Sequence, residues 1–483
     1  MQTTRRFSPL LTDLYQLTMA YGYWKTGTHQ SEAVFHLFYR KQPFAGGFAI
    51  ACGLADVVAY LRDFAFTDDE LSYLGMLAGN DRRPLFEPGF LDYLRTLRWM
   101  GSLDAVPEGT PVFPQEPLLR VQGPLLQCQL IETALLNFVN YQTLVATKAA
   151  RVCLAAQGDP VIEFGLRRAQ GPDGGLTASR AAYIGGCAAT SNVLAGQLFG
   201  IPVRGTHAHS WVMAFDSERD AFAAYARALP NNAIFLVDTY DTLDGVQHAI
   251  EAGRVLRDRG FELGGIRLDS GDLAWLSIEA RRLLDAAGFP KAAIVASNDL
   301  DEATIASLKQ QGARINTWGV GTKLVTGGDQ SALGGIYKLA AVRDPSGRWH
   351  HKVKLSEQTA KISTPGIQQV RRFRRDGEFI GDMIFNLDGP PDPGRTIVDR
   401  QDSTRRKNIP ANADSEDLLV PIIHHGRVVY QSPAIDTIRE RTKTQLASLH
   451  ETRKRFLNPH EYPVGLSPDL HDLKTHLVQE ARV

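Results

Sequence analysis

The chain has 483 residues, and because single hydrophobic cores stop growing at about 250–300 residues, we expect two domains. Its composition, 43% hydrophobic and 22% charged, excludes a largely disordered or fibrous protein. The 53 basic and 53 acidic residues balance, so no net field recruits nucleic acid or an anionic membrane. The four cysteines form no CxxC pair, and neither an apolar leader nor a membrane span is visible. We therefore expect a cytoplasmic protein without disulfides, in which local sites hold any anionic ligand.

The first 155 residues predict an N-terminal α+β domain. Thr12 is a suitable cap for a helix over residues 13–25, which Gly27 would end. Residues 33–42 have the composition of a strand, and the apolar spacing of residues 131–151 predicts a long helix.

Residues 156–335 predict a parallel β/α barrel. Short apolar segments recur along this part of the chain, and most are separated by helical patterns such as residues 244–259 and 301–311. The uncharged run 181–203 predicts a buried helix that leads into a strand. Reactive residue types follow each segment, and a barrel brings all such strand ends to one mouth, whereas an open doubly wound sheet brings together only about two. The predicted strands are residues 161–167, 201–205, 233–240, 265–269, 293–298 and 317–325.

Residues 336–483 predict a C-terminal segment that completes the α+β domain. A hairpin is expected from residues 368–375 and 378–385, and a second one near His425 and Gly426. Residues 434–456 have helical apolar spacing. The basic run at residues 371–375 is interpreted as a solvated or subunit-facing edge. The predicted fold class is α/β, an irregular parallel barrel plus an α+β domain built from both chain termini.

Two histidines, His207 and His209, follow a predicted strand. Such a pair could bind a metal, act as acid and base, or accept a phosphoryl group. The alternative is a pair of hydrogen-bonded histidines before the next helix. Metal binding is the weaker interpretation, because no other His or Cys lies at zinc-like spacing.

Arg267 and Asp269 are two residues apart, so they lie on one face of a strand. This pair could hold a sugar or an anionic ring, with Asp269 or Asp272 available for Mg²⁺. The alternative is a structural pair, with Asp272 capping the following helix. The glycine-dense segment 317–328 could bind phosphate oxygens through its backbone or form a tight turn, and it does not match the P-loop pattern.

Several segments together resemble nicotinate phosphoribosyltransferases over almost the whole chain. They are LLTDLYQLTMAYGYW (10–24), FYRKQPFAGGFAIACGL (38–54), EFGLRRAQGPDGG (163–175), RGTHAHSW (204–211), IRLDSGDL (266–273), GTKLVTGGDQSALGGIYKL (321–339), KLSEQTAKISTPG (354–366) and NPHEYPVGLSPDL (458–470). The resemblance implies a type II phosphoribosyltransferase barrel in a homodimer with shared active sites. It implies a ligase-type reaction of nicotinate with 5-phosphoribosyl 1-diphosphate, coupled to ATP and Mg²⁺, for NAD salvage.

The resemblance also implies roles for residues of the barrel. His209 would be phosphorylated during ATP hydrolysis, and His207 occupies a variable position of the same motif. Asp269 would hold the ribose or organise Mg²⁺, with Asp272 as a second metal ligand.

The remaining implied contacts concern the substrates. Thr206 and Arg267 would bind nicotinate, and Tyr15 and Phe164 would cover the two ring faces. Arg167 or Arg168 would approach the phosphates. Part of the 5-phosphate cradle would be Thr326, Gly327 and Gly328. Some relatives have Cys-Pro where this chain has the two glycines, so phosphate contacts here would come from the backbone.

Three alternative functions differ from this one in the residues that they require. A nicotinamide or quinolinate phosphoribosyltransferase differs in the charge required around the ring. A non-catalytic nucleotide-binding barrel would not need the His209, Arg267 and Asp269 that are present. An aldolase-type barrel would need a Schiff-base lysine at a strand end, and Lys323 is the only candidate in the later strands.

Overall fold

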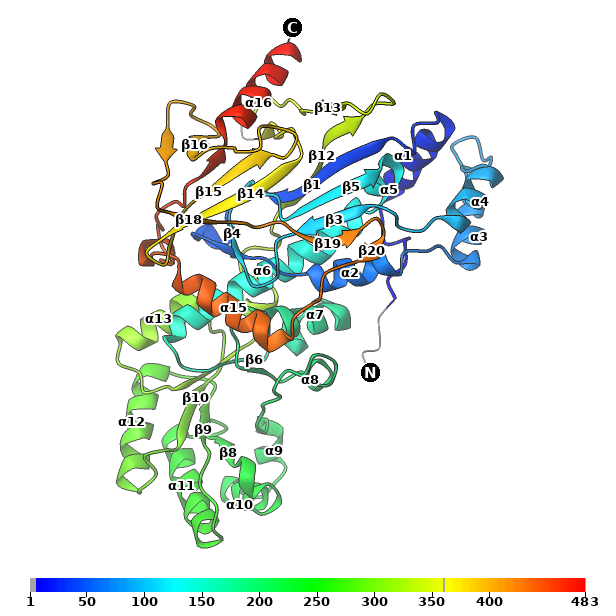
Figure 1. Ribbon diagram of the computed structural model, residues 1–483. Helices are drawn as coiled ribbons and strands as arrows, with labels where there is room; N and C mark the ends of the chain where they lie inside the picture. The colour runs from blue at the N-terminus through cyan, green and yellow to red at the C-terminus, as the bar shows by residue number, and fades with distance from the viewer. Residues whose placement is uncertain (1–5, 359–360, 483) are drawn as a thin grey trace. The chain divides into compact units, whose positions relative to one another are not determined.

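The structure is a computed structural model that describes residues 6–358 and 361–482. They form two compact units, shown in Figure 1. The first contains the described parts of Met1–Leu144 and Ala332–Val483, and the second is Val145–Ser331. The long helix α6 (Glu132–Ala156) contributes residues to both units.

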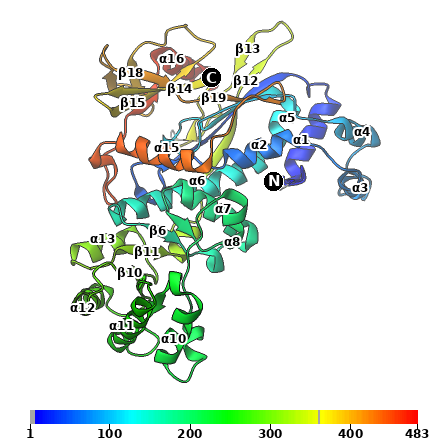
Figure 2. The same cartoon turned by 60° about the horizontal axis from the view of Figure 1, so that its bottom comes forward.

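The second unit is built on a six-stranded parallel sheet with the order β7-β6-β11-β10-β9-β8. Helices follow most strands. α12 packs against β9 and β10, and α11 packs against β9. Figure 2 shows α11, α12 and β10 in this unit. The strands are β6 (Val161–Glu163), β7 (Ala189–Thr190), β8 (Ile234–Leu236), β9 (Gly265–Leu268), β10 (Ala293–Ala296) and β11 (Thr317–Val320). The helices are α7 (Gly171–Ile184), α8 (Val193–Phe199), α9 (His209–Met213), α10 (Glu218–Ala228), α11 (Thr242–Asp258), α12 (Leu273–Ala286), α13 (Glu302–Gln310) and α14 (Thr322–Val325).

Residues 203–207 connect the two edges of this sheet. Val203 forms an isolated parallel bridge with Thr190 of β7. On the other side, the His207 ring accepts a hydrogen bond from the Leu236 N–H of β8 at 3.2 Å. The predicted strand over residues 201–205 is therefore reduced to one bridge, and a side chain completes the ring of strands. This arrangement confirms the predicted irregular barrel.

The first unit contains two larger sheets and a two-stranded one. The seven-stranded sheet has the order β13-β12-β1-β5-β3-β19-β20, and the six-stranded sheet has the order β17-β16-β21-β15-β14-β18. The strands of the first are β1 (Glu32–Tyr39), β3 (Ser102–Ala105), β5 (Leu119–Pro124), β12 (Gly335–Arg343), β13 (Trp349–His351), β19 (Val420–His424) and β20 (Arg427–Val428). Those of the second are β14 (Gln368–Arg375), β15 (Glu378–Asn386), β16 (Thr396–Asp399), β17 (Arg406–Asn408), β18 (Asp414–Asp417) and β21 (Val464–Leu466), while β2 (Ala49–Ile50) pairs with β4 (Pro111–Val112).

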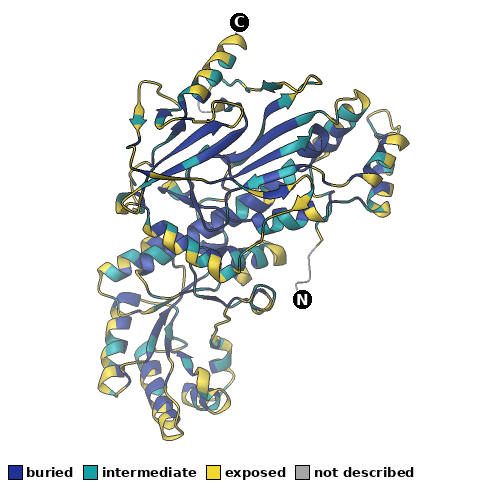
Figure 3. Cartoon of the chain, in the orientation of Figure 1, coloured by how far each residue is buried: buried dark blue, intermediate teal, exposed yellow. Residues whose placement is uncertain are grey.

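Helices complete this unit around one large apolar core that draws on both chain termini. In Figure 3 the strands are mostly buried, and exposed residues concentrate on outward helix faces and loops. An amphipathic helix that packs on a sheet produces this pattern, because its apolar face is buried against the sheet while its polar face stays in contact with water. The helices are α1 (Leu14–Lys25), α2 (Leu54–Arg62), α3 (Asp68–Met76), α4 (Pro88–Thr96), α5 (Leu125–Leu130), α15 (Ile435–Ala447) and α16 (Pro468–Glu480). Among the described residues, no helix is both long and apolar enough to cross a bilayer.

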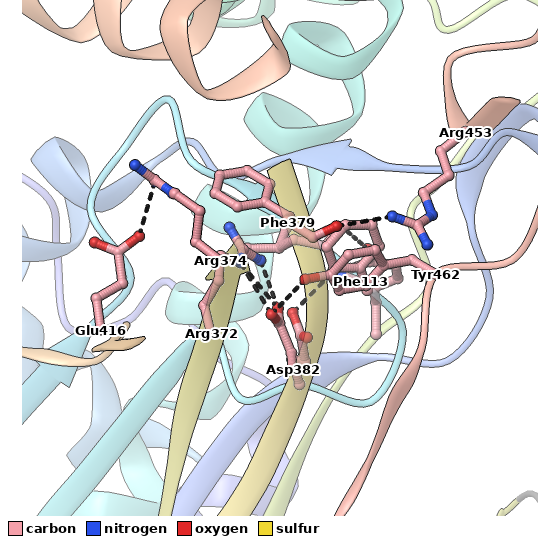
Figure 4. A network of polar contacts seen from close by, with 11 residues as sticks. Phe113, Arg372, Arg374, Phe379, Asp382, Glu416, Arg453 and Tyr462 are labelled. Carbon is pink, nitrogen blue, oxygen red and sulfur yellow. Dashed lines mark hydrogen bonds and ion pairs between the residues drawn. The ribbon is translucent and has the colours of Figure 1, made fainter. Parts of the chain in front are cut away.

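A fully buried ion pair lies in the six-stranded sheet of the first unit. Figure 4 shows its two residues, Arg372 and Asp382. The Arg372 guanidinium of β14 meets the Asp382 carboxylate of β15 at 2.6 Å, and both side chains are 0% exposed. Tyr462 donates a hydrogen bond of 2.7 Å to the same carboxylate. Burial, reinforced by the Asp382 charge, raises the pKa of Glu116 well above its usual range. Asp382 is the carboxylate that forms the ion pair with Arg372.

This ion pair corrects the prediction for the basic run. Arg372 lies on a strand with neighbours on both sides, β15 and β18, so it is not at an edge. Alternation along the strand turns Arg371 to the opposite face, where it binds the partly exposed Asp417 at 2.7 Å. Only one of these two adjacent arginines is therefore solvated.

Two helix predictions also need correction. The helix predicted over residues 434–456 ends at Ala447 as α15, because the Ser448 carbonyl accepts a hydrogen bond from the Phe379 N–H of β15. At α1 the N-cap residue is Asp13 rather than Thr12, and its carboxylate accepts a hydrogen bond from Thr133. Both hairpins form as predicted, β14 with β15 and β19 with β20.

Candidate functional site

The carboxyl ends of neighbouring strands place polar side chains together in the second unit. Asp238, Asp269 and Ser297 follow β8, β9 and β10, which are adjacent in the sheet. Parallel strands end at a common edge, so these groups lie side by side without any special loop. The site therefore follows directly from the order of the strands.

Arg267 and Thr206 form one part of the site. The Arg267 guanidinium donates a hydrogen bond of 2.6 Å to the Thr206 hydroxyl. Burial lowers the pKa of Arg267 from its ordinary value, and the nearby Arg167 charge acts in the same direction, while Asp269 and Asp238 oppose both. The guanidinium remains charged, since an arginine pKa starts above 12. A partly buried cation of this kind can bind a carboxylate through two parallel hydrogen bonds.

His209 and Asp269 form the second part. The His209 Nε2 atom lies 3.9 Å from the Asp269 Oδ2 atom, and both side chains are about two-fifths exposed, at 40% and 39%. The His209 Nδ1 atom lies 3.2 Å from the Thr239 hydroxyl. When Nδ1 carries the proton and donates it to Thr239, Nε2 keeps its lone pair. The imidazole is thus held at one nitrogen, and its other nitrogen faces a carboxylate in a solvated space.

Asp238 fixes the backbone beneath these groups. Its Oδ2 atom accepts hydrogen bonds from the Asp269 N–H at 3.0 Å and from the Ser270 hydroxyl at 2.6 Å. Ser297 in turn donates a short hydrogen bond to Asp269. The next residue, Asn298, has a φ of 111°, which is rare for a residue other than glycine and is typical of functional loops. Asp269 is therefore oriented from both neighbouring strands.

The loop after β6 carries Phe164 and Arg167. Buried Glu163 accepts hydrogen bonds from the Gly165 N–H, the Ser179 hydroxyl and the Thr190 hydroxyl, and these bonds fix the start of the loop. The Phe164 ring packs over Gly319 of β11, where a Cβ atom would lie 2.6 Å from it. Only glycine leaves room for the ring at that position. Arg167 is exposed in the short helix that follows.

The predicted phosphate loop follows β11, next to the Phe164 loop in the sheet. Gly327 and Gly328 both have positive φ angles, 73° and 59°, which glycine adopts without strain. The Thr326 hydroxyl donates to the Thr322 carbonyl at 2.7 Å and accepts from the Gly328 N–H at 3.3 Å. Thr326 therefore shapes the turn from within.

Three residues from the sequence analysis lie outside these contacts. Asp272 caps α12 by accepting a hydrogen bond of 3.0 Å from the Trp275 N–H. His207 is buried against Phe222, Tyr225 and Phe235, and both of its ring nitrogens lie within hydrogen-bonding distance of backbone groups. Tyr15 belongs to the first unit, where it is 52% exposed on α1.

The residues of the site fit a magnesium ion that shares its ligands with a substrate. Among residues 6–358 and 361–482, no three His, Cys, Asp or Glu side chains are grouped as a metal site. Mg²⁺ at phosphate sites usually has one or two carboxylate ligands, with waters and substrate oxygens completing its shell. The half-exposed Asp269 carboxylate meets that need, and in the described part of the chain the buried Asp238 Oδ1 atom has no hydrogen-bond partner.

One buried charged cluster, beside the predicted phosphate loop, was not predicted from the sequence pattern. Lys148 and Arg151 of α6 both form ion pairs with Glu302 of α13. A signal for this cluster was present, because two basic residues three apart in a helix share one face. The role of Glu163 in fixing the loop was also not predicted, because in the sequence it is simply the polar residue at the end of an apolar strand.

Fold and site together define an α/β barrel protein with charged and hydrogen-bonding side chains grouped at its strand ends. Models of the nicotinate phosphoribosyltransferase N-terminal domain, family domain and C-terminal domain match residues 10–140, 160–344 and 367–474. The nicotinate phosphoribosyltransferase of Bacillus subtilis is 45% identical over 483 residues, covering 98% of this chain and 97% of that protein. The enzyme of that name from Caenorhabditis elegans is 40% identical, with 98% and 94% covered. The crystal structure of human nicotinic acid phosphoribosyltransferase matches with a TM-score of 0.83 and 34% identity, over 96% of this chain and 99% of that one.

The chain belongs to the nicotinate phosphoribosyltransferase family. This result confirms the resemblance found in the sequence.

Proposed function

We propose that this protein joins nicotinate to 5-phosphoribosyl 1-diphosphate, giving nicotinate mononucleotide and diphosphate. In this reaction the pyridine nitrogen attacks the anomeric carbon of the ribose, and diphosphate leaves with the electron pair of the broken bond. The observation that carries the proposal is the pairing of Arg267 with Thr206 beside His209 and Asp269 at one sheet edge. Relatives that bear the name of this activity match almost the full length of the chain.

Each substrate has a group of matching chemistry. The Arg267 guanidinium would bind the nicotinate carboxylate, with the Thr206 hydroxyl beside it. Phe164 would stack on one face of the pyridine ring, and Tyr15 would cover the other, from the same chain or across a homodimer. Arg167 would approach the substrate phosphates, and the turn of Thr326, Gly327 and Gly328 would hold the 5-phosphate.

His209 is the proposed acceptor of the γ-phosphoryl group of ATP. Its Nε2 lone pair would form a bond to phosphorus as the bond to ADP breaks, and water would later release phosphate. The phosphorylated ring would carry about two negative charges on the group attached to Nε2, an atom that lies 3.9 Å from the Asp269 Oδ2 atom. Repulsion at this distance would reorganise the substrate loops, so ATP cleavage would favour product formation.

A magnesium ion would be held by Asp269, with Asp272 a weaker candidate because its carboxylate caps α12. When bound, Mg²⁺ stabilises the charge of the departing diphosphate. Asp269 itself would orient the ribose and restrain His209. We further propose that the protein acts in NAD salvage in the cytoplasm.

A product assay tests the proposal. Purified protein should form nicotinate mononucleotide from nicotinate and 5-phosphoribosyl 1-diphosphate, faster with ATP and Mg²⁺. Competition with nicotinamide and quinolinate should show a strong preference for nicotinate, because one guanidinium matches one carboxylate. A preference for either competitor, or no product, would refute the assignment.

The role of His209 has its own test. His209→Asn should abolish ATP hydrolysis and acid-labile phosphate on the protein, and leave a slow transfer that does not depend on ATP. His476→Asn, on the exposed face of α16, is the matched control and should behave as wild type. ATP coupling that survives in His209→Asn would exclude this histidine as the acceptor.

A further inference from the structure

A cavity of about 210 Å³ lies in the first unit, where β13 and β15 end and α16 begins; all three elements are labelled in Figure 1. Part of its wall is apolar and includes Phe385, Pro393 and Leu473. A cavity of roughly 150 Å³ can hold benzene, so this one has room for a single ring with a short substituent. Its polar lining consists of His351, Asn386, Asp388, Ser467 and Asp469.

Hydrogen bonds within the chain fix one wall of the cavity. The Asn386 Oδ1 atom accepts hydrogen bonds from the Ile367 N–H at 2.8 Å and from the Asp388 N–H at 3.2 Å. The loop that follows contains Pro390 and Pro393, whose rings restrict the backbone. This wall is therefore in place before a ligand arrives, which lowers the entropic cost of binding.

The other end of the Asn386 amide is available to a ligand. The two backbone donors identify Oδ1, so the remaining atom is the Nδ2 donor. Among the described residues, Nδ2 has no hydrogen-bond partner, although the residue is only 9% exposed. Asn386 lines the cavity, and its amide can therefore donate to an oxygen of a molecule bound there.

The lining has a negative charge. The His351 Nε2 atom lies 3.3 Å from the Asp388 Oδ2 atom. Burial lowers the pKa of His351 from its ordinary 6.5, although Asp388 opposes this shift, so the ring is neutral near neutral pH and does not cancel the carboxylate charge. Asp469 adds a second carboxylate, which is exposed and has no ion pair in the described part of the chain. The lining contains no lysine or arginine from the described residues.

One cation approaches this lining from outside the cavity. The Arg371 guanidinium lies 4.9 Å from the centre of the Phe385 ring. It is paired with Asp417 at 2.7 Å, so its charge is already balanced. The two carboxylates of the cavity therefore keep their charge beside an apolar wall, which favours an organic cation and repels an anion.

We propose that this cavity binds a small organic cation, an ammonium or amidinium group attached to a body of about one ring. The N–H groups of the ligand donate to Asp388 and Asp469, and its body lies against Phe385 and Leu473. An oxygen on that body accepts from the Asn386 amide. All lining residues belong to the first unit, whereas the strand-end site belongs to the second, so this inference does not depend on the proposed function.

Ligand-observed NMR titrations of the full chain test the site with two probes of similar shape. Benzylamine is a cation near neutral pH, and benzyl alcohol is neutral. Benzylamine should bind with roughly millimolar affinity, as expected for so small a ligand. It should bind at least about fivefold more tightly than benzyl alcohol, because only the amine forms ion pairs.

Three variants locate the binding. Asp388→Asn should lower the benzylamine affinity about tenfold, the effect of one charge-assisted hydrogen bond, and leave benzyl alcohol unchanged. Asp469→Asn should lower it about two- to fivefold, because this carboxylate is exposed to solvent. Asp472→Asn is the matched control and should bind as wild type, since it removes the same charge from the same helix at an 82% exposed position outside the lining.

Four results would overturn the inference. They are an absence of benzylamine binding, equal affinities for the two probes, wild-type binding in both cavity variants, and equal losses in Asp469→Asn and Asp472→Asn. Asp388→Asn also removes the ion pair of His351, so urea unfolding is measured on each variant. Should Asp388→Asn fail to fold, the comparison of Asp469→Asn with Asp472→Asn decides the outcome.

Discussion

Each of the two units pairs a basic side chain with an aspartate, and the two pairs differ in how far they are buried and in how closely their atoms approach. In the first unit, Arg372 and Asp382 are completely buried and 2.6 Å apart. Figure 4 shows the two side chains pointing toward one another. In the second unit, His209 and Asp269 are about two-fifths exposed and 3.9 Å apart. The enclosed pair has its counter-charge, its tyrosine donor and no room for a ligand. In the open pair, His209 is hydrogen-bonded to Thr239 and Asp269 to Ser297, and both side chains remain accessible to solvent.

The comparison predicts that the enclosed pair contributes to stability and the open pair to activity. The free energies of unfolding of single-residue variants test this contrast. The largest effect should come from the residue whose loss leaves a buried charge alone.

Arg372→Met should lower the free energy of unfolding by about 3–5 kcal/mol, because it leaves the Asp382 carboxylate buried without its cation. Arg371→Met on the same strand is the control and should cost about 0–1 kcal/mol, since its pair with Asp417 is partly exposed. Urea unfolding curves measure both. Equal effects would mean that burial does not separate the two arginines.

His207 should give the second largest effect, through pH. Burial, with smaller contributions from Arg267 and His209, lowers its pKa from 6.5 to about 4. The unfolded chain therefore binds a proton that the folded chain does not, so stability is complete above about pH 6.5 and falls as the pH drops towards 4. The loss should reach about 2–3 kcal/mol.

His207→Gln should flatten this part of the pH profile, because glutamine has no titrating ring. The measurement is the difference in unfolding free energy between wild type and variant at several pH values. Parallel profiles would contradict the assignment of the low pKa to a buried neutral imidazole.

Tyr462→Phe should cost about 1.5 kcal/mol, the value of a hydrogen bond to a charged group. The substitution removes only the hydroxyl that binds Asp382 and keeps the ring stacked on Phe113, with centroids 3.8 Å apart. Tyr73→Phe on α3, where the side chain is 52% exposed, is the control and should be neutral. Thermal unfolding distinguishes the two, and an unchanged Tyr462→Phe would show that the hydroxyl adds nothing.

His209→Asn should have the smallest effect on stability, less than about 0.5 kcal/mol, because its ring is half-exposed and weakly bound. This is the variant expected to lose ATP turnover. A strongly destabilised His209→Asn would remove the contrast between the two regions.

The sequence predicted those features of the fold that arise from local pattern. Short apolar strands alternating with capped helices define the barrel, and Asp269 lies at the end of β9 as the pattern requires. The strand predicted at residues 201–205 failed, because its connection to β8 runs through the His207 side chain, which no periodicity encodes.

Tertiary pairing accounts for the other errors. Arg372 is buried because β15 and β18 flank its strand, and β18 joins from a distant part of the chain. Lys148 was overlooked because its partner Glu302 belongs to another helix. Charged residues that look ordinary in a sequence are the ones whose roles depend most on such distant neighbours.

The junction at residues 203–207 has a consequence for motion. A regular barrel is sealed by a ladder of backbone hydrogen bonds, and opening it breaks several at once. Here one bridge and one imidazole make the seam, and Thr206 and His209 lie on or beside it. A movement of the segment that carries the proposed phosphoryl acceptor therefore breaks fewer hydrogen bonds than the opening of a regular barrel does.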